Sequence, residues 1–341
     1  MSLWMVRGDK YGQYQSLALE EGFAYNFSSV SDLTNATSRE AVLELLRNVR
    51  PDAKENQLKN WSNQLFALAH RIQKGDLVAM PLRNSPHIAI GRVTGPYEYR
   101  TDLGDVHHTL PVEWTQDNIP RTTFGQDLLY SFGAFMTVCQ IQRNNAEERV
   151  LAVLKDNKDP GFMPSEAKDE TKVGIDSAEE GLPDVEQMAR DQIMSHIEQH
   201  FKGHDLSRLV DAVLQAEGYV TKRSAPGPDG GVDVLAGRGT LGFEGPKLCV
   251  QVKSSAAPAD VTVLRSLQGT MTNFKADQGL LVSWGGFNKA VENEARLSFF
   301  SVRLWDANDL VEAVLKNYDS LPEELKSELP LKRIWALVIE E

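Results

Sequence analysis

Hydrophobic residues recur at helical spacing in two stretches of the first 150 residues. Residues 38–49 place apolar side chains on one helical face, and Ser38 is suited to cap the first turn. Residues 57–72 repeat that pattern. Short apolar runs typical of strands lie at 4–6, 77–80, 88–93, 97–99 and 110–114. Short strands with two inserted helices predict a small, open and mostly β barrel.

The last third of the chain alternates between helical and strand patterns. Residues 206–214 form a one-faced helical pattern, and Gly218 is well placed to end that helix. Strands are predicted at 232–236, 248–253, 279–283 and 301–304, and helices at 259–271, 288–298 and 308–315. This order predicts an α/β (α+β) fold in which a mixed sheet is flanked by helices.

A polar, acidic segment separates these two regions. Residues 151–205 hold 6 basic and 13 acidic residues, a net charge of −7, whereas the whole chain has a net charge of −12. Such a segment buries too little apolar surface to order itself. We therefore predict a first domain at 1–150, an acidic flexible linker at 151–183 and a second domain at 184–341. Because the acidity is concentrated in the middle segment, it argues against general coating of nucleic acid but not against a site-specific nuclease.

Several classes of protein are excluded by composition. The two cysteines, Cys139 and Cys249, cannot build a disulfide framework or a four-cysteine zinc site. No apolar run reaches the roughly 18 residues that span a bilayer. The first ten residues contain Arg7, Asp9 and Lys10, which is unlike a signal peptide. These features predict a soluble, cytoplasmic protein with no membrane partner.

The chemistry is concentrated in two predicted strands. Side chains alternate between faces along a strand, so Val250 and Val252 share one face while Gln251 and Lys253 share the other. On the preceding strand Asp233 lies between Val232 and Val234, so its side chain also points away from the apolar face. The glycine-rich loop at 237–246 would let the two strands pair as a hairpin. Pairing would bring the Asp233 carboxylate near the Gln251 amide and the Lys253 ammonium.

An acid, a second oxygen ligand and a lysine suit metal-assisted hydrolysis of a phosphodiester. Mg²⁺ prefers carboxylate and other oxygen ligands, and Mn²⁺ is the alternative ion. Asp233, the Gln251 side chain and the Val252 carbonyl are the predicted metal ligands. Lys253 would orient the attacking water or stabilise charge on the phosphorus. Asp233, Gln251 and Lys253 are thus the predicted catalytic residues.

These residues resemble the Mrr-type branch of the PD-(D/E)XK nuclease superfamily. The resemblance covers about 204–310 and is carried by the run 228–233 (Pro-Asp-Gly-Gly-Val-Asp), the run 251–253 (Gln-Val-Lys) and the glycine-rich strand end at 279–287. It implies Mg²⁺-dependent cleavage of DNA, often modified DNA, in restriction or defence. Many relatives carry a glutamate where this chain has Ser207, and Asp211 one turn later is a substitute.

Each of these residues also has a structural interpretation. Asp233 could cap a turn, and Lys253 could be a charge that protects an edge strand from aggregation. Asp229 is better explained as a turn residue than as a ligand. The predicted DNA-binding residues are Lys222 and Arg223, which could contact phosphate, and Gln268, which could face the site or solvent.

The N-terminal region resembles PUA-like barrels of the EVE type, which read modified bases. The resemblance is carried by residues 74–78 and 91–99. It implies that aromatic side chains hold a flipped base. Trp4, Tyr97 and Tyr99 are the predicted base-recognition residues, with Trp61 and Trp114 as further candidates; the alternative is that they are core aromatics. His107 and His108 lack a metal-ligand set around them and are predicted to be exposed loop residues.

Together, these features predict a two-domain, Mg²⁺-dependent endodeoxyribonuclease of restriction or defence type. Its partner would be DNA, and cleavage of both strands by one site per chain would need a homodimer. Three alternatives remain open. They are a catalytically silent nucleic-acid-binding module, a repair or junction-processing nuclease, and an interaction scaffold in which the linker is the functional part.

Overall fold

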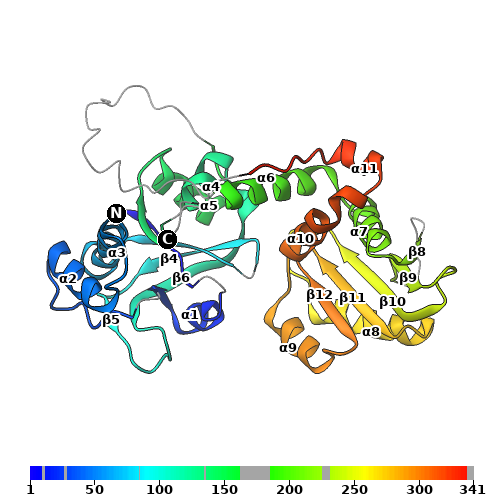
Figure 1. Ribbon diagram of the computed structural model, residues 1–341, viewed down its shortest axis with the longest axis horizontal. Helices are drawn as coiled ribbons and strands as arrows, with labels where there is room; N and C mark the ends of the chain where they lie inside the picture. Colours follow the sequence, from blue (N-terminus) through cyan, green and yellow to red (C-terminus); the bar gives the residue numbers. More distant parts are fainter. Residues whose placement is uncertain are drawn as a thin grey trace. The chain divides into compact units, whose positions relative to one another are not determined.

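The computed structural model describes residues 1–9, 12–26, 29–83, 85–133, 136–161, 185–224 and 231–335. The chain forms two compact units, one over Met1–Asp191 and one over Gln192–Trp335 (Figure 1). Each unit has its own sheet and its own hydrophobic core. The mixed α/β fold predicted from the sequence is therefore confirmed.

The first unit is built around a seven-stranded, mostly antiparallel sheet. Its strand order is β2-β6-β4-β3-β1-β7, with β5 paired to β6, and only β1 and β3 run parallel. The sheet is curved like a half-barrel. The strands are β1 (Leu3–Val6), β2 (Phe23–Asn26), β3 (Leu77–Pro81), β4 (His87–Val93), β5 (Glu98–Tyr99), β6 (His108–Pro120) and β7 (Val138–Ile141).

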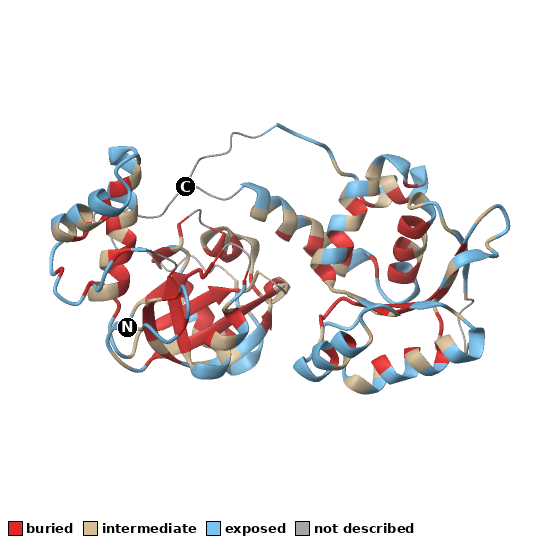
Figure 2. Ribbon diagram, turned by 60° about the horizontal axis from the view of Figure 1, so that its bottom comes forward, coloured by how far each residue is buried: buried red, intermediate tan, exposed pale blue. Residues whose placement is uncertain are grey.

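Helices cover both faces of this sheet (Figure 2), and its central strands are therefore buried on both sides. Leu3, Leu77 and Ile90 pack with the last two helices of the unit, while Trp4 and Val78 pack with the π-helical turn η1. The helical elements are α1 (Gln15–Glu21), α2 (Arg39–Val49), α3 (Glu55–Phe66), η1 (Ala67–Arg71), η2 (Arg121–Thr123), α4 (Gln126–Phe132) and α5 (Ala146–Asp156). The Ser38 side chain accepts a hydrogen bond from the Ala41 amide and so caps α2 as predicted.

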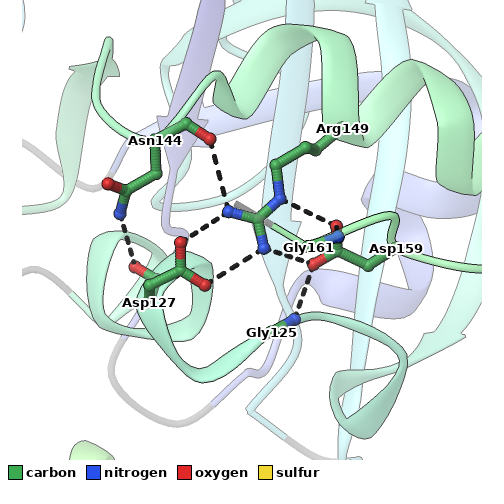
Figure 3. Close-up of polar contacts among 6 residues, drawn as sticks. All are labelled: Gly125, Asp127, Asn144, Arg149, Asp159 and Gly161. Carbon is green, nitrogen blue, oxygen red and sulfur yellow. Dashed lines mark hydrogen bonds and ion pairs between the residues drawn. The ribbon is translucent and has the colours of Figure 1, made fainter. Parts of the chain in front are cut away.

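The end of the first unit lies beyond the boundary that composition predicted. Helix α5 packs Val150 and Val153 into the core, and the segment after it is held by Asp159. The Asp159 carboxylate accepts hydrogen bonds from Arg149 and from the Gly125 amide (Figure 3). Residues 151–161 thus belong to this unit and not to a linker. The apolar side chains of α5 bury enough surface to order this segment, although it is rich in polar residues. The rest of the predicted linker, 162–183, lies outside the described residues.

The boundary between the units falls inside a helix. Helix α6 (Val185–His200) begins in the first unit and ends in the second. In its first half the Asp191 carboxylate accepts two hydrogen bonds of 2.6 Å from Arg121, and both side chains are buried. The predicted start of the second domain at residue 184 is therefore about two helical turns earlier than the division seen in the structure.

The second unit contains a five-stranded mixed sheet in the order β12-β11-β10-β9-β8. Strands β10, β11 and β12 are parallel, and β9 and β8 are antiparallel to their neighbours. The strands are β8 (Val220–Arg223), β9 (Val234–Arg238), β10 (Glu244–Lys253), β11 (Gln278–Ser283) and β12 (Val302–Trp305). Strand β8 was not predicted from the sequence, because its mostly exposed side chains form no apolar run.

Helices cover both faces of this second sheet (Figure 2). Val250 and Val252 of β10 belong to a large core with α6, α7 and α10, whereas Cys249 belongs to a smaller core with α8 and α9. The helices that follow α6 are α7 (His204–Ala216), α8 (Val261–Phe274), α9 (Lys289–Leu297), α10 (Ala307–Asn317) and α11 (Glu323–Glu328). No helix in the described part of the chain is long and apolar enough to cross a membrane.

Candidate active site

Strand β10 is the central strand of its sheet, and its two faces differ in chemistry. Val250 and Val252 point to the core formed with α7 and α10, so Gln251 and Lys253 lie on the opposite face, toward α8. The predicted alternation is therefore present. Because β9 and β11 flank β10 on both sides, the alternative interpretation of Lys253 as an edge-strand charge is wrong.

The Gln251 side chain is buried beside the turn that leads into β9. It is 5% exposed, and its Oε1 atom has no hydrogen-bond partner among the described residues. Gly231 has a φ of +83°, and a Cβ at that position would lie 3.6–3.8 Å from Ser266 Oγ, Gln251 Nε2 and Thr270 Oγ1. Glycine thus provides the left-handed turn that places the chain against the Gln251 amide.

The Asp233 carboxylate is held against the backbone of β10. Its Oδ2 atom accepts a hydrogen bond of 2.8 Å from the Val252 amide, and its Oδ1 atom lies 3.4 Å from the Ser207 hydroxyl of α7. Within a strand, the N–H and C=O of one residue point to the same side. The Val252 carbonyl therefore faces the side of β10 on which Asp233 lies. Asp233 is thus joined to the β10 residue that stands between Gln251 and Lys253.

Lys253 and Ser283 lie side by side at the ends of two parallel strands. Their Cα atoms are partners in the register of β10 and β11. Lys253 is half-buried, and no hydrogen bond or ion pair joins its ammonium group to a described residue. Ser283 is fully buried, and its hydroxyl has no partner in the described part of the chain. The sequence analysis missed Ser283; the signal was a hydroxyl that ends the apolar run 280–282.

Asp211 is a second acidic residue of α7, besides Asp205, which pairs with Arg208. Asp211 lies one turn after Ser207, its Oδ2 atom accepts a hydrogen bond from Gln215, and its Oδ1 atom is buried with no partner among the residues that the structure describes. Among the described residues, no group of three His, Cys, Asp or Glu side chains could hold a metal ion. A cation bound here would thus be held by the Asp233 carboxylate together with neutral oxygens, or by two carboxylates if Asp211 also takes part.

The predicted DNA-binding residues lie in two different places. Lys222 and Arg223 are exposed on β8, the edge strand next to β9. Gln268, by contrast, donates a hydrogen bond of 3.0 Å to Ser298. Ser266 and Thr270 are the α8 residues that approach Gln251, so Gln268 lies on another face of that helix. Asp229 falls outside the described residues.

Among the predicted base-recognition residues, Trp4 is a core residue. It is 3% exposed, packs in the core under η1, and donates its indole N–H to Asp76. It cannot present a face to a base. Tyr97 packs beside α2 and α3, and its hydroxyl lies 2.8 Å from His108 Nδ1. Tyr99 is half-buried, and its ring contacts those of both neighbouring histidines.

The prediction that His108 lies in an exposed loop is wrong. His108 begins β6 and is fully buried, with its Nε2 atom 3.1 Å from the Val30 carbonyl. Burial lowers its pKa to about 4, so the ring is neutral at neutral pH. Its role is to join β6 to Tyr97 and the Val30 loop. A pair of adjacent histidines gives no sequence signal that distinguishes this arrangement from an exposed loop.

Two separate regions of the chain match two different protein-family models. Residues 198–314 match the Mrr catalytic-domain model, which is described as a restriction endonuclease. This part of the chain therefore carries a restriction endonuclease domain, and it contains all residues of the candidate active site. Residues 8–129 match a domain of unknown function, numbered 8426. The resemblance to PUA-like barrels stays a prediction.

Solved structures give distant similarities. The DNA modification-dependent restriction endonuclease AspBHI is 14% identical, with 96% of this chain and 84% of that chain covered and a TM-score of 0.34. The MspJI restriction endonuclease in complex with a 27-mer oligonucleotide is 14% identical, with coverages of 97% and 80% and a TM-score of 0.32. A protein of unknown function, AF1548, is 17% identical over 33% of this chain and 65% of its own length, with a TM-score of 0.25. No curated protein matches.

Proposed function

We propose that the restriction endonuclease domain at 198–314 makes this chain a divalent-metal-dependent endodeoxyribonuclease. The observation that carries the proposal is the hydrogen bond from the Val252 amide to Asp233. It fixes a carboxylate to the strand that also carries Gln251 and Lys253 on one face. The proposed site would then combine this acid with the Gln251 amide oxygen and the Lys253 ammonium group, neither of which has a hydrogen-bond partner among the described residues.

The oxygen atoms at this end fit a hard cation such as Mg²⁺, with Mn²⁺ as the alternative. Asp233 Oδ1, Gln251 Oε1 and the Val252 carbonyl would hold it, because Mg²⁺ accepts one or two carboxylates with neutral oxygens and water. The unpartnered Gln251 Oε1 supports this assignment, since a buried acceptor without a donor is costly. When bound, the cation would polarise the phosphate and lower the pKa of the attacking water.

The chain's own residues then divide the remaining tasks. Lys253 provides positive charge beside the scissile phosphate and can orient the attacking water through its ammonium protons. Asp233 keeps its position through Val252 and the Ser207 contact. Asp211 is the side chain that would add a second carboxylate. Lys222 and Arg223 on the neighbouring edge strand would bind phosphates of the same DNA.

The first unit is proposed to select the DNA that is cut. Its resemblance to base-reading barrels suggests modified DNA as the target and restriction of foreign DNA as the setting. Tyr99 is the better remaining candidate for stacking on a base, because Trp4 is buried in the core. Cleavage of both strands by one site per chain would require two chains, so we propose a homodimer, formed either in solution or on DNA.

The test is a cleavage panel on methylated, hydroxymethylated, glucosylated and unmodified duplexes with Mg²⁺ or Mn²⁺. We expect Asp233→Ala and Lys253→Ala each to lower the cleavage rate at least about a hundredfold, as for other electrostatic catalytic groups. Matched controls lie at the other end of β10 and just before β11. Asp277 also accepts a hydrogen bond from a β10 amide, that of Lys247, so Asp277→Ala and Lys247→Ala should leave the rate nearly unchanged.

Other outcomes would favour other functions. Wild-type cleavage rates in folded Asp233→Ala or Lys253→Ala would contradict the assigned roles. Binding of the duplexes without cutting of any of them would favour a silent DNA-binding module. A preference for branched over modified duplexes would favour a repair or junction-processing nuclease.

A further inference from the structure

Ser283 is a buried hydroxyl placed beside the proposed catalytic lysine. It is the register partner of Lys253, and side chains of partnered residues in neighbouring strands point to the same face of a sheet. Leu281, two residues earlier, packs in the core with α8, which confirms that this face of β11 is the one shared with Gln251 and Lys253. Ser283 therefore stands on the site's own face of the sheet.

The surrounding backbone holds Ser283 in place. The Trp284 amide donates to the Lys253 carbonyl, and the Gly286 amide donates to the Ser283 carbonyl. A Cβ at Gly285 would lie 2.5 Å from the carbonyl oxygens of both Ala256 and Ala257. The loops after β10 and β11 are thus in close contact next to Ser283.

Two polar atoms on this face are buried and lack partners among the described residues, Ser283 Oγ and Gln251 Oε1. A buried hydroxyl without a partner destabilises the fold, and alanine would fill the same space without that cost. Gln251 Oε1 already has a proposed partner in the cation. Ser283 has no such partner, although the half-buried residue Lys253 lies next to it on the adjacent strand.

We propose that Ser283 is a positioning residue that directs the ammonium group of Lys253. Lysine has a flexible stem and three donors and no acceptor, so its head needs a fixed acceptor to point reproducibly. The Ser283 hydroxyl accepts one of these donors once DNA fills the site, which leaves the other two for the phosphate and the attacking water. This inference rests on the proposed nuclease function and adds a residue to it.

A structural role and a positioning role of the Ser283 hydroxyl predict opposite effects of its removal on stability. If the role is structural, truncation to alanine lowers both the stability of the protein and its cleavage rate. A serine kept for positioning lowers the stability of the free protein, so Ser283→Ala should unfold at the same or a higher temperature while cleaving more slowly. The loss should fall on kcat and leave KM nearly unchanged, because the contact is made when the substrate is already bound.

The experiment compares Ser283→Ala, Ser283→Thr, Lys253→Ala and the Ser283→Ala/Lys253→Ala double variant by thermal unfolding and single-turnover cleavage. We expect Ser283→Ala to cut about tenfold more slowly, a typical coupling for neighbouring residues. Ser283→Thr, which keeps the hydroxyl, should recover most of the rate. The double variant should be no slower than Lys253→Ala. Ser301→Ala is the control, since the Ser301 hydroxyl has its own partner in the Ser298 carbonyl.

The outcomes separate this inference from the function on which it rests. If wild type cuts and Ser283→Ala cuts equally fast, only the role of Ser283 is overturned. It is also overturned if the losses from Ser283→Ala and Lys253→Ala multiply in the double variant, or if Ser283→Ala unfolds at a clearly lower temperature. A wild-type chain that cuts no substrate of the panel overturns the nuclease function and this inference together.

Discussion

Two buried polar clusters, one in each unit, differ in how far their hydrogen bonds are completed. In the first unit, Arg149 uses all five of its N–H donors on Asp127, Asp159 and the Asn144 carbonyl (Figure 3). In the second unit, Gln251 Oε1 and Ser283 Oγ are buried without a partner in the described part of the chain. Folding alone supplies hydrogen-bond partners for the Arg149 cluster, whereas the two atoms in the second unit still lack partners among the described residues.

Under the proposed function, the difference separates a cluster that holds the fold from one that a ligand completes. A buried charge is tolerated when its hydrogen bonds are satisfied, and Arg149 meets this condition through side chains of its own unit. The incomplete cluster lowers the stability of the folded chain. Its retention is explained if a cation and DNA complete it. We expect substitutions in the two clusters to have opposite effects on stability.

The largest effect on stability is expected for Arg149→Met. It leaves the Asp159 carboxylate, whose side chain is only 4% exposed, without its cation. Breaking such a buried pair costs about 3–5 kcal/mol in the free energy of unfolding. Urea unfolding would measure this loss. Arg47→Met, which removes an exposed pair with Glu55, is the control and should change the midpoint little. Equal midpoints for the two variants would show that the complete cluster does not hold the first unit.

A smaller effect of opposite sign is expected for Gln251→Leu. The variant removes the unpartnered Oε1 atom and keeps a side chain of similar volume, so it should raise the free energy of unfolding by about 1 kcal/mol. Cleavage should fall sharply, because an oxygen of the proposed cation site is lost. Gln268→Leu removes a glutamine that has a partner, Ser298, and should not raise stability. A destabilised Gln251→Leu would mean that the site is already complete.

The smallest effect is expected for the stability of the first unit in acid, where Asp127 and Asp159 take up protons. Hydrogen bonds from Arg149 lower the pKa of Asp127. Burial alone would raise the pKa of Asp159, but its hydrogen bonds from Arg149, Gly125 and Gly161 lower it. A carboxylate with a lowered folded-state pKa stabilises the protein above its unfolded pKa of about 3.9, and this contribution is lost as pH falls through the folded value.

The corresponding measurement is the urea midpoint between pH 6 and pH 2 for wild type and Arg149→Met. Wild type should lose more stability than the variant below about pH 4, where the two carboxylates take up protons. Parallel curves over this range would show that Arg149 does not set the titration of the two aspartates.

Periodicity predicted the helices and strands of the second unit well, because β11 and the second half of β10 are buried and mostly apolar. It missed β8, whose edge position removes the need for apolar side chains. It also missed α5, where Val150 and Val153 contribute to the core although the surrounding composition is polar. Composition over a long window cannot detect a helix that buries one narrow face.

For the candidate site, alternation along β10 placed Gln251 and Lys253 on one face. The hairpin predicted Asp233 near them, and in the structure Asp233 accepts a hydrogen bond from Val252, the residue between them. Ser283 could not be found in this way, because it lies 30 residues after Lys253 and is joined to it only by the register of two parallel strands. The aromatic residues were harder still. Burial, which a single sequence does not reveal, decides whether Trp4 is a core residue or a binding surface.

The two oxygens of Asp233 serve different purposes. Oδ2 is committed to the Val252 amide and closes the open end of the hairpin, whereas Oδ1 has only a long contact with Ser207. Under the proposed function, folding and ligand binding would use separate atoms of this one side chain. A cation approaching Oδ1 would find its ligand oriented in advance by the backbone, with no rearrangement of the strand needed to receive it.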